Sequence, residues 1–388
     1  MEFSFTDEQQ MIRDTAASFL AEVSDSKAVR QAMATEAGFD PDLWGQITAE
    51  MFWHAVHIPE KYGGLGLGYV ELVAMLEVMG RHLLCAPFFS TVCLGVNALR
   101  VAGTDAQQQE HLSRIASQGS RATLAWTGEG RNRDANAVAS TFELDGAGAV
   151  VNGCFHHVTD GHTADSLIVA ARAGGSAGSD GIGLFIVPAD ADGITRRWRP
   201  TLDQTRKQAE VQFDEVRVAT DGIMRDVGNA WPLLQQVLDL ATVATAAEQT
   251  GGAEQVLLYT VDYIKERKQF GRPVGGFQAM KHKAADMMLK AESSRSAAYY
   301  AACVADAYLA GTSSAAELGE AASIASAYCS DAYFFNAGCA IQMHGGIGFT
   351  WEHDAHLYFK RAKSTQHYFG DPAFHRERLS QIVLGDAS

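Results

Sequence analysis

Apolar residues recur at two different spacings along the chain, and the spacing changes twice. From Thr6 to about Leu112 they recur mostly every three or four residues, as in DEQQMIRDTAASFLAEV and YVELVAMLEVMGRHLL, which predicts helices. Thr6 is the expected N-cap of the first helix, and Gln9 completes a capping box. The first part of the chain is therefore predicted to be helical.

Between about Arg121 and Arg225 the apolar segments become short, rich in β-branched residues and separated by Gly, Asp and Asn turns. The segments of this kind are TLAW, GAVVNG, DSLIVAA, IGLFIVPA, ITRRW and AEVQFDEVRV. They predict a small β domain, in which GGSAGSDG, residues 174–181, is an exposed hairpin loop.

After Trp231 the helical spacing returns and persists almost to the last residue. The predicted helices cover 231–267, 276–310, 314–343, 351–364 and 372–384, with a turn at GGIGF. Long helices with short connections form antiparallel bundles. The pattern predicts an α+β multidomain protein with an N-terminal helical domain (1–120), a middle β-barrel-like domain (121–225) and a C-terminal four-helix bundle (226–388).

Composition narrows the possible partners and compartment. The 388 residues are 47% apolar and carry a net charge of −15 without a basic run, which argues against a nucleic acid partner. The start, MEFSFTDEQQ, is acidic, and the most apolar later stretch, AAYYAACVADAYLAG, is interrupted by Asp306. Neither a signal peptide nor a membrane span is expected, which favours the cytoplasm.

Several motifs that would indicate other chemistry are incomplete. The six cysteines include no CxxC pair and are expected to be buried free thiols in a reducing compartment. The histidine groups in FHHVTDGH and WEHDAH do not complete a zinc pattern, so no metal site is predicted. GGLGLG lacks the GxGxxG spacing of a phosphate loop, and no GxSxG motif of a serine hydrolase occurs.

Two stretches near the C-terminus place donor side chains beside glycines. In YIKERKQFGRPVGGFQ, residues 263–278, Arg267 and Gln269 precede a glycine turn, and in QMHGGIGF, residues 342–349, Gln342 precedes Gly345 and Gly346. A guanidinium beside accessible glycine backbone suits a pyrophosphate group.

These two motifs resemble the acyl-CoA dehydrogenase family, and the resemblance covers the whole chain. FSFTDEQQMIRDTAASFL is similar to the family's opening helix, IPEKYGGLGLGYVE to its glycine turn and VNGCFHHVTDG to its flavin-facing strand. The resemblance implies FAD held between two subunits, usually of a homotetramer. It also implies an acyl-CoA substrate and an electron-transfer flavoprotein as electron acceptor.

The resemblance assigns cofactor roles to individual residues. The residues that reach the neighbouring subunit's FAD are matched by Arg267, Gln269 and Phe270, with Phe277 and Gln278 behind them. The adenine and pyrophosphate contacts are matched by Gln342, Gly345 and Gly346. Thr159 resembles the hydroxyl at flavin N5, and the strand along the isoalloxazine is matched by Trp126 and Thr127.

Two departures from the family lie in the middle domain. The family's TEPGAGSD loop is replaced by TGEGRNRD, residues 127–134, which leaves the acyl-chain and CoA contacts undefined. His157 stands where an aromatic residue usually shields the flavin. A histidine at this place is either an acid–base group or a flat packing group, and both interpretations stay open.

The family's reaction needs a glutamate that removes the α proton of the thioester, and both usual positions lack one. The position after the RAK stretch holds Phe369. The position on the first helix of the C-terminal domain falls at or next to Ala241, whose neighbours Leu240 and Thr242 are not ionisable either. Phe369 retains the backbone N–H that holds the thioester carbonyl in the family. Phe369 and Gly370 are expected to line the substrate cavity.

Glu248 is the proposed catalytic base. It lies seven residues after Ala241, which on a helix is nearly two turns, so the two positions share a face about 10 Å apart. Small neighbours, including Gly251 and Gly252, are expected to leave room for a substrate. The competing interpretation is a structural ion pair of Glu248 with another helix, and Asp239 and Asp371 are lesser candidates for the base.

The resemblance therefore implies FAD-dependent conversion of an acyl-CoA, from fatty acid or steroid side-chain oxidation, to a 2,3-enoyl-CoA. Two alternatives remain open. The chain is a flavin-poor structural subunit of a heterotetramer with a paralogue, or it is a flavin monooxygenase on the same fold.

Overall fold

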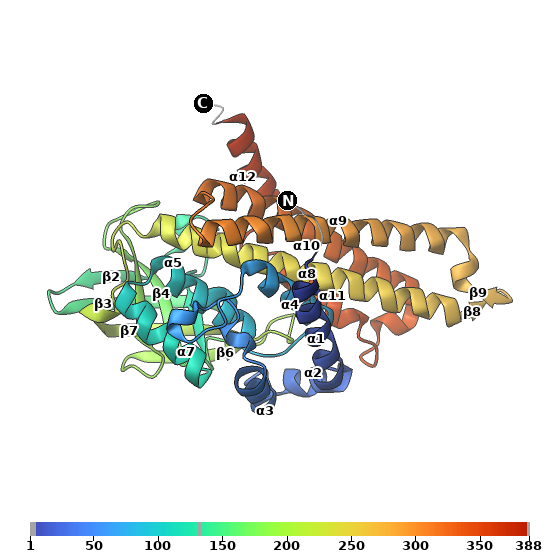
Figure 1. Cartoon of the computed structure of the whole chain (residues 1–388), viewed down its shortest axis with the longest axis horizontal. Helices are drawn as coiled ribbons and strands as arrows, with labels where there is room; N and C mark the ends of the chain where they lie inside the picture. The colour runs from blue at the N-terminus through green and yellow to red at the C-terminus, as the bar shows by residue number, and fades with distance from the viewer. Residues whose placement is uncertain (1–4, 131–132, 386–388) are drawn as a thin grey trace. The chain divides into compact units, whose positions relative to one another are not determined.

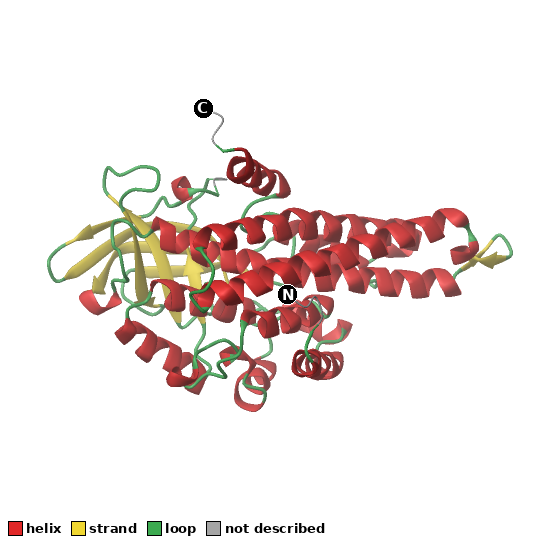
Figure 2. Ribbon diagram, turned by 45° about the horizontal axis from the view of Figure 1, so that its top comes forward, coloured by secondary structure: helices red, strands yellow, loops and turns green. Residues whose placement is uncertain are grey.

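Strands occupy the middle of the chain and helices occupy both ends, as Figures 1 and 2 show. The computed structural model describes residues 5–130 and 133–385. They divide into two units. Unit 1 comprises the residues up to Arg30, Gly68–Leu84 and the residues from Thr242 onward, and unit 2 comprises Gln31–Leu67 and Cys85–Ala241. The predicted division into three domains is a different grouping and stays a prediction.

Unit 2 is built on a seven-stranded sheet. Its strands are β1 (Ala122–Ala125), β2 (Thr141–Leu144), β3 (Gly148–Thr159), β4 (Ser166–Ala173), β5 (Ile182–Pro188), β6 (Ile194–Arg199) and β7 (Gln208–Ala219). The order is β1-β4-β2-β3-β7-β6, and β5 also pairs with β4. The predicted hairpin loop at 174–181 joins the antiparallel strands β4 and β5, as expected.

The longest strand pair is β3 with β7, and β3 contains a bulge near the residues expected to contact the flavin. Alternate residues such as Phe155 and Phe213 are fully buried in the core of the unit, and their rings meet edge to face at 5.3 Å. The register shifts between Phe155 and Val158, so His156 and His157 form a bulge. His157 has φ of 56° there. The bulge re-aims the side chains on this part of β3.

Short helical segments complete unit 2. They include α3 (Pro41–Gly45), η4 (Phe89–Val96), α5 (Asn97–Ala102), α6 (Asp105–Gln107) and α7 (Ser113–Gln118). The mostly apolar segment η4 packs against β1, and all of its residues are buried.

Unit 1 is helical. Its main helices are α1 (Asp7–Val23), α4 (Tyr69–Arg81), α8 (Trp231–Glu266, from Thr242), α9 (Gln278–Leu309), α10 (Ala315–His344), α11 (Ala355–Thr365) and α12 (Pro372–Leu384). Helices α8, α9 and α10 run side by side in Figure 1. Buried Asn336 on α10 joins the other two, because its Nδ2 donates to the carbonyls of Ala253 and Met287 at 3.0 Å each.

The ends of the helices follow the local signals in the sequence. Thr6 and Gln9 form the predicted capping box of α1. Between α8 and α9 lies the short hairpin of β8 (Lys268–Gln269) and β9 (Arg272–Pro273). Its turn residues, Phe270 and Gly271, have φ of 53° and 76°, the conformation of a tight hairpin turn.

A cluster of charges ties four helices of unit 1 together. The Glu77 carboxylate on α4 pairs with Arg13 on α1 at 2.8 Å and with Arg295 on α9 at 3.1 Å. Glu254 on α8 accepts from Arg295 at 2.9 Å and from Arg81. Burial alone would lower the pKa of Arg295, but Glu77 and Glu254 outweigh it and raise that pKa. Glu77 and Glu254 therefore hold the Arg295 guanidinium charged.

Two other expectations concern the chain as a whole. No helix among the described residues is long and apolar enough to cross a membrane. All six cysteines are free thiols, as predicted, but Cys154 and Cys303 are half-buried where burial was expected.

Candidate active site

Glu248 lies in the interior of unit 1, and its residue is 6% exposed. Three successive positions on α8 are enclosed by three other helices. The Glu248 backbone lies against Gly80 on α4, Gln249 Nε2 donates to Thr365 on α11 at 3.2 Å, and Thr250 Oγ1 contacts Cys329 Sγ on α10 at 3.7 Å. This segment of α8 is therefore fixed on several sides, which holds a carboxylate in one place.

The two glycines after Glu248 accommodate protein rather than ligand. A Cβ on Gly251 would lie 1.7 Å from the carbonyl oxygen of Glu77, and one on Gly252 would lie 2.4 Å from the Tyr333 ring. The expectation that these glycines leave room for a substrate is wrong. Their role is the close approach of α4 and α10 to α8.

The two usual positions for the base are apolar in the structure as well as in the sequence. Ala241 is fully buried on α8. Phe369 precedes Gly370, whose φ is +124° and whose Cβ would lie 2.3 Å from the Phe374 ring. Gly370 is therefore required by both its conformation and its packing.

The lesser candidates have structural contacts. Asp371 caps α12, because its Oδ1 accepts from the Phe374 N–H at 2.9 Å. Asp239 is 2% exposed and accepts from Gln235 at 3.3 Å on the same helix. Neither contact favours these acids over Glu248 as the base.

The residues expected to reach the FAD of a neighbouring subunit lie at the surface of unit 1. Arg267, Gln269 and Phe270 lie on or beside the β8–β9 hairpin, with Phe270 90% exposed at its tip. Phe277 supports this tip, since its ring meets that of Phe270 at 6.1 Å. Within the described part of the chain, the Arg267 guanidinium has no ion-pair partner, whereas Gln269 donates to the Lys268 carbonyl at 2.8 Å. Gln278 begins α9 and is exposed.

The second glycine motif forms the end of α10. Gln342, Gly345 and Gly346 are exposed, and nothing lies within 4 Å of a Cβ built on either glycine. His344, the last residue of α10 before Gly345, is held in place by two contacts. Its ring stacks on Tyr263 at 4.4 Å, and its Nδ1 donates to the Ala340 carbonyl. Open glycine backbone allows close approach of a ligand, and a guanidinium without an ion-pair partner fits the pyrophosphate of a flavin cofactor.

The residues expected along the isoalloxazine lie together in unit 2. Trp126 and Thr127 follow β1, and Thr159 ends β3. Trp126 and Thr159 are each 6% exposed. Among the described residues, the Thr159 hydroxyl has no hydrogen-bond partner, so it remains available to a ligand.

Thr127 is fixed by His156, for which no sequence signal indicates this role. Its carbonyl accepts from the His156 N–H at 2.8 Å, and its hydroxyl donates to the His156 carbonyl at 2.7 Å. The bulge in β3 makes this contact, and a bulge has no sequence signal comparable to a helix cap. His157, the neighbouring residue in the bulge, is exposed, and its Nδ1 lies 3.1 Å from Gln208 Oε1. The departing loop at 127–134 includes residues 131 and 132, which lie outside the described residues.

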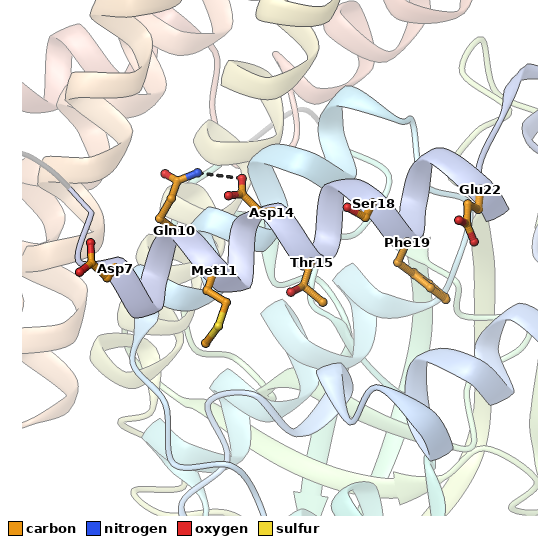
Figure 3. A pocket seen from close by; sticks show the side chains of 8 residues that line it. All are labelled: Asp7, Gln10, Met11, Asp14, Thr15, Ser18, Phe19 and Glu22. Carbon is orange, nitrogen blue, oxygen red and sulfur yellow. Dashed lines mark hydrogen bonds between the residues drawn. The ribbon is translucent and has the colours of Figure 1, made fainter.

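A groove along the outer face of α1, drawn in Figure 3, contains none of the predicted site residues. Its lining combines the acids Asp7, Asp14 and Glu22 with the apolar side chains of Met11 and Phe19. The groove adds no group to the candidate active site.

Comparison with known proteins identifies the family. Its N-terminal, middle and C-terminal domain profiles, each described as acyl-CoA dehydrogenase, match residues 6–119, 123–216 and 228–384. The acyl-CoA dehydrogenase IpdE2 of Mycobacterium tuberculosis is 33% identical over 384 residues, which cover 97% of this chain and 98% of that protein. The chain belongs to the acyl-CoA dehydrogenase family. It is an oxidoreductase that acts on acyl-CoA with a flavin cofactor.

Solved structures of acyl-CoA dehydrogenases have the same fold. Butyryl-CoA dehydrogenase from Megasphaera elsdenii matches with a TM-score of 0.90 at 25% identity, covering 99% of this chain and 100% of that one. A structure described as a variant of the Tcur3481-Tcur3483 steroid ACAD matches with a TM-score of 0.86 at 29% identity, covering 98% of this chain and 99% of that one. The predicted arrangement of helical, β and helical regions is confirmed.

Proposed function

We propose that this acyl-CoA dehydrogenase converts an acyl-CoA to a 2,3-enoyl-CoA with Glu248 as the base and FAD as the cofactor. The observation that carries the proposal is a buried carboxylate on α8 in a chain whose two usual base positions hold Phe369 and Ala241. Burial from water favours proton abstraction from carbon, because the carboxylate is not screened by solvent.

The residues for FAD fall into two groups. The first group holds the isoalloxazine and consists of Thr159, Trp126 and Thr127. The second group holds the adenine and pyrophosphate of a neighbouring subunit's FAD. It consists of Arg267, Gln269, Phe270, Gln342, Gly345 and Gly346, with Phe277 and Gln278 behind the hairpin. The exposure of the second group, in which Phe277 alone is partly covered, supports contact across a subunit boundary. When bound, FAD supplies the acceptor for the β hydrogen, which leaves the substrate as hydride.

The chain's own groups handle the proton and the developing charge. Glu248 takes the α proton, and the backbone N–H of Phe369 donates to the thioester carbonyl as negative charge develops on its oxygen. Phe369 and Gly370 line the acyl site. The α proton and the β hydride together account for the two hydrogens removed from the substrate.

The relatives support the proposed substrate class and a multimeric assembly. One structural relative is described as a steroid acyl-CoA dehydrogenase and named by two chains, Tcur3481-Tcur3483. We extend this description to the present chain as a bulky, ring-bearing acyl-CoA substrate from steroid or fatty acid side-chain oxidation. The proposed assembly is a homotetramer or a heterotetramer with a paralogue, with an electron-transfer flavoprotein as acceptor in the cytoplasm.

A second candidate is a structural subunit of such a heterotetramer that binds little flavin. Phe369 favours this structural role, because a subunit without catalysis needs no base at the usual position. The paired description of the steroid relative is consistent with it.

The experiment is anaerobic bleaching of the purified protein by a panel of straight-chain, branched and ring-bearing acyl-CoAs. The proposal predicts a yellow protein whose flavin absorbance falls with at least one acyl-CoA, with formation of the matching enoyl-CoA. A colourless protein that gains flavin only with a paralogue supports the subunit role. Rapid oxygen consumption by the reduced protein supports a monooxygenase.

A further inference from the structure

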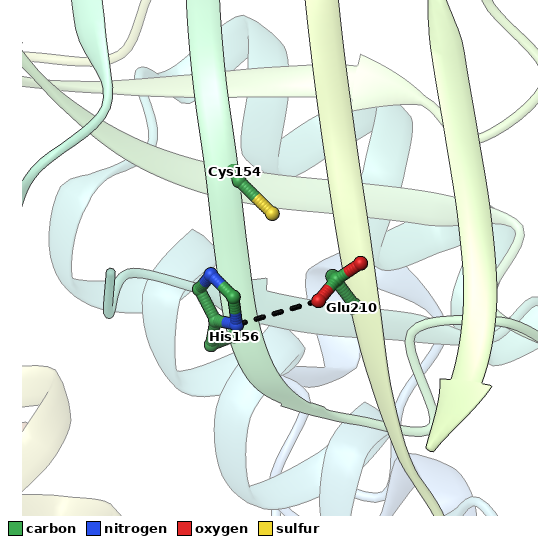
Figure 4. Close-up of side chains that lie close together, drawn as sticks. All are labelled: Cys154, His156 and Glu210. Atoms are coloured by element: carbon green, nitrogen blue, oxygen red, sulfur yellow. Dashed lines mark ion pairs between the residues drawn. The ribbon is translucent and has the colours of Figure 1, made fainter. Parts of the chain in front are cut away.

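Three potential metal ligands of different kinds meet on the outer side of the β3–β7 pair. They are Cys154 and His156 on β3 and Glu210 on β7, drawn together in Figure 4. One ligand atom from each, the thiol sulfur, an imidazole nitrogen and a carboxylate oxygen, lies within 4.8 Å of the other two. The His156 Nδ1 and Glu210 Oε2 atoms are 3.6 Å apart.

The register of the two strands brings these side chains together. Phe155 pairs with Val211, and both are buried in the core, so Cys154, His156 and Glu210 project from the opposite face. The bulge after Phe155 sets two residues of β3 opposite Glu210. The cluster therefore spans two adjacent strands, which is why no local sequence motif predicts it.

The chemistry of this set suits a zinc ion. Zinc binds thiolate, imidazole and carboxylate in a tetrahedral arrangement, with adjacent ligand atoms about 3.3–3.8 Å apart. The distances in the cluster are within about 1 Å of those values, which side-chain rotation can supply. Three protein ligands would leave the fourth position to water.

Charged side chains of both signs lie near the cluster. Glu129 adds negative charge near the Cys154 thiol, and Arg199 adds positive charge. A bound metal ion would be held by the thiolate form of Cys154 together with the Glu210 carboxylate. Arg199 donates to Glu210.

Arg199 is the group that competes with the metal. Its side chain is 55% exposed, against 19% for Glu210, so it can turn toward solvent and release the carboxylate. Arg197, the cross-strand neighbour of Glu210, is also exposed and keeps positive charge near this face.

We propose that Cys154, His156 and Glu210 form a zinc-binding site, and that the Arg199–Glu210 ion pair closes this site when no metal is bound. Nothing in the proposed dehydrogenation requires the site. None of its three ligands is assigned to the base or to FAD, and His156 contacts Thr127 through its backbone, which leaves the imidazole to the metal.

The test is titration of chelator-treated holoenzyme with Zn²⁺ by calorimetry, and with Cd²⁺ by its thiolate absorption in the ultraviolet difference spectrum. We expect one equivalent per chain, with a cadmium–thiolate band. Cys154→Ser, His156→Gln and Glu210→Gln should each weaken Zn²⁺ binding at least about tenfold, and the first should remove the band. Arg199→Ala should strengthen Zn²⁺ binding.

Cys303→Ser is the matched control, since Cys303 is the other half-buried thiol and lies in unit 1. It should bind Zn²⁺ as the wild type does. Wild-type flavin content and unfolding midpoint in every variant exclude misfolding. The proposal is overturned if the wild type takes up no Zn²⁺, if any of the three ligand variants binds it with wild-type affinity, or if Arg199→Ala leaves the affinity unchanged.

Discussion

His57 shows how a single buried residue makes stability depend on pH. Burial, and secondarily the charge of Arg100, lower the pKa of His57 to about 3, while its hydrogen bond to Asn97 opposes this change. The folded state therefore keeps His57 neutral, whereas the unfolded chain takes up a proton below pH ~6.5. Its contribution to stability is complete above pH ~6.5 and is lost as the pH falls toward 3.

His57→Gln should remove this dependence. Between pH 7 and pH 5, the free energy of unfolding should fall by about 2 kcal/mol less in the variant than in the wild type, at about 1.4 kcal/mol per pH unit below the unfolded pKa. Urea unfolding at the two pH values measures the difference. An equal fall in both proteins would show that His57 is not the residue responsible.

Predictions for single residues were correct where the conformation depends only on residues close in sequence. The capping box of Thr6 and Gln9 depends on residues three apart and was predicted correctly. The glycines after Glu248 were misinterpreted, because small residues on a helix accommodate a ligand or another helix equally well. Only the positions of Glu77 and Tyr333, far away in the sequence, decide between these.

At the scale of elements, Glu77 joins α1, α4 and α9. Its side chain is 4% exposed, and three guanidinium groups lie within 4.0 Å of it. Glu77→Gln would leave these cations with less compensating charge, and should lower the free energy of unfolding by about 3–5 kcal/mol in urea.

Glu292→Gln is the control for Glu77→Gln. Glu292 also pairs with Arg295, but it is 55% exposed, so this change should cost no more than about 0.5 kcal/mol. Similar unfolding midpoints for the two variants would contradict the role assigned to the cluster.

Helices and strands were predicted from the sequence in most places, because their apolar spacing is regular. The long helices α8, α9 and α10 begin and end within a few residues of the predicted limits. Strand β2 was missed, since Thr141–Leu144 has one buried residue and owes its conformation to pairing with β3 and β4. The Cys154 cluster was missed for a related reason, because it depends on the register of two strands.

At the scale of the whole molecule, the exposed β8–β9 hairpin is the expected contact with a neighbouring subunit's FAD. Arg267→Ala should raise the dissociation constant for FAD about 10–100-fold, because a charge-assisted hydrogen bond contributes about 1.5–3 kcal/mol. Fluorescence titration of the flavin-free protein measures this constant. Lys268→Ala, an exposed cation on the same hairpin, should leave it unchanged, and equal effects of the two changes would argue against a specific role of Arg267.

The family and the fold were identified from sequence motifs spread along the chain, but the catalytic base was inferred from what two positions lack. The most direct test is therefore the rate of flavin reduction by the best acyl-CoA, measured by anaerobic stopped flow in Glu248→Gln and in Asp239→Asn. Asp239 is a buried acid on the same helix, so it controls for loss of a buried charge. We predict that Glu248→Gln slows reduction about 10²–10⁴-fold at unchanged flavin content, and that Asp239→Asn does not. Reduction of Glu248→Gln at the wild-type rate would contradict the account.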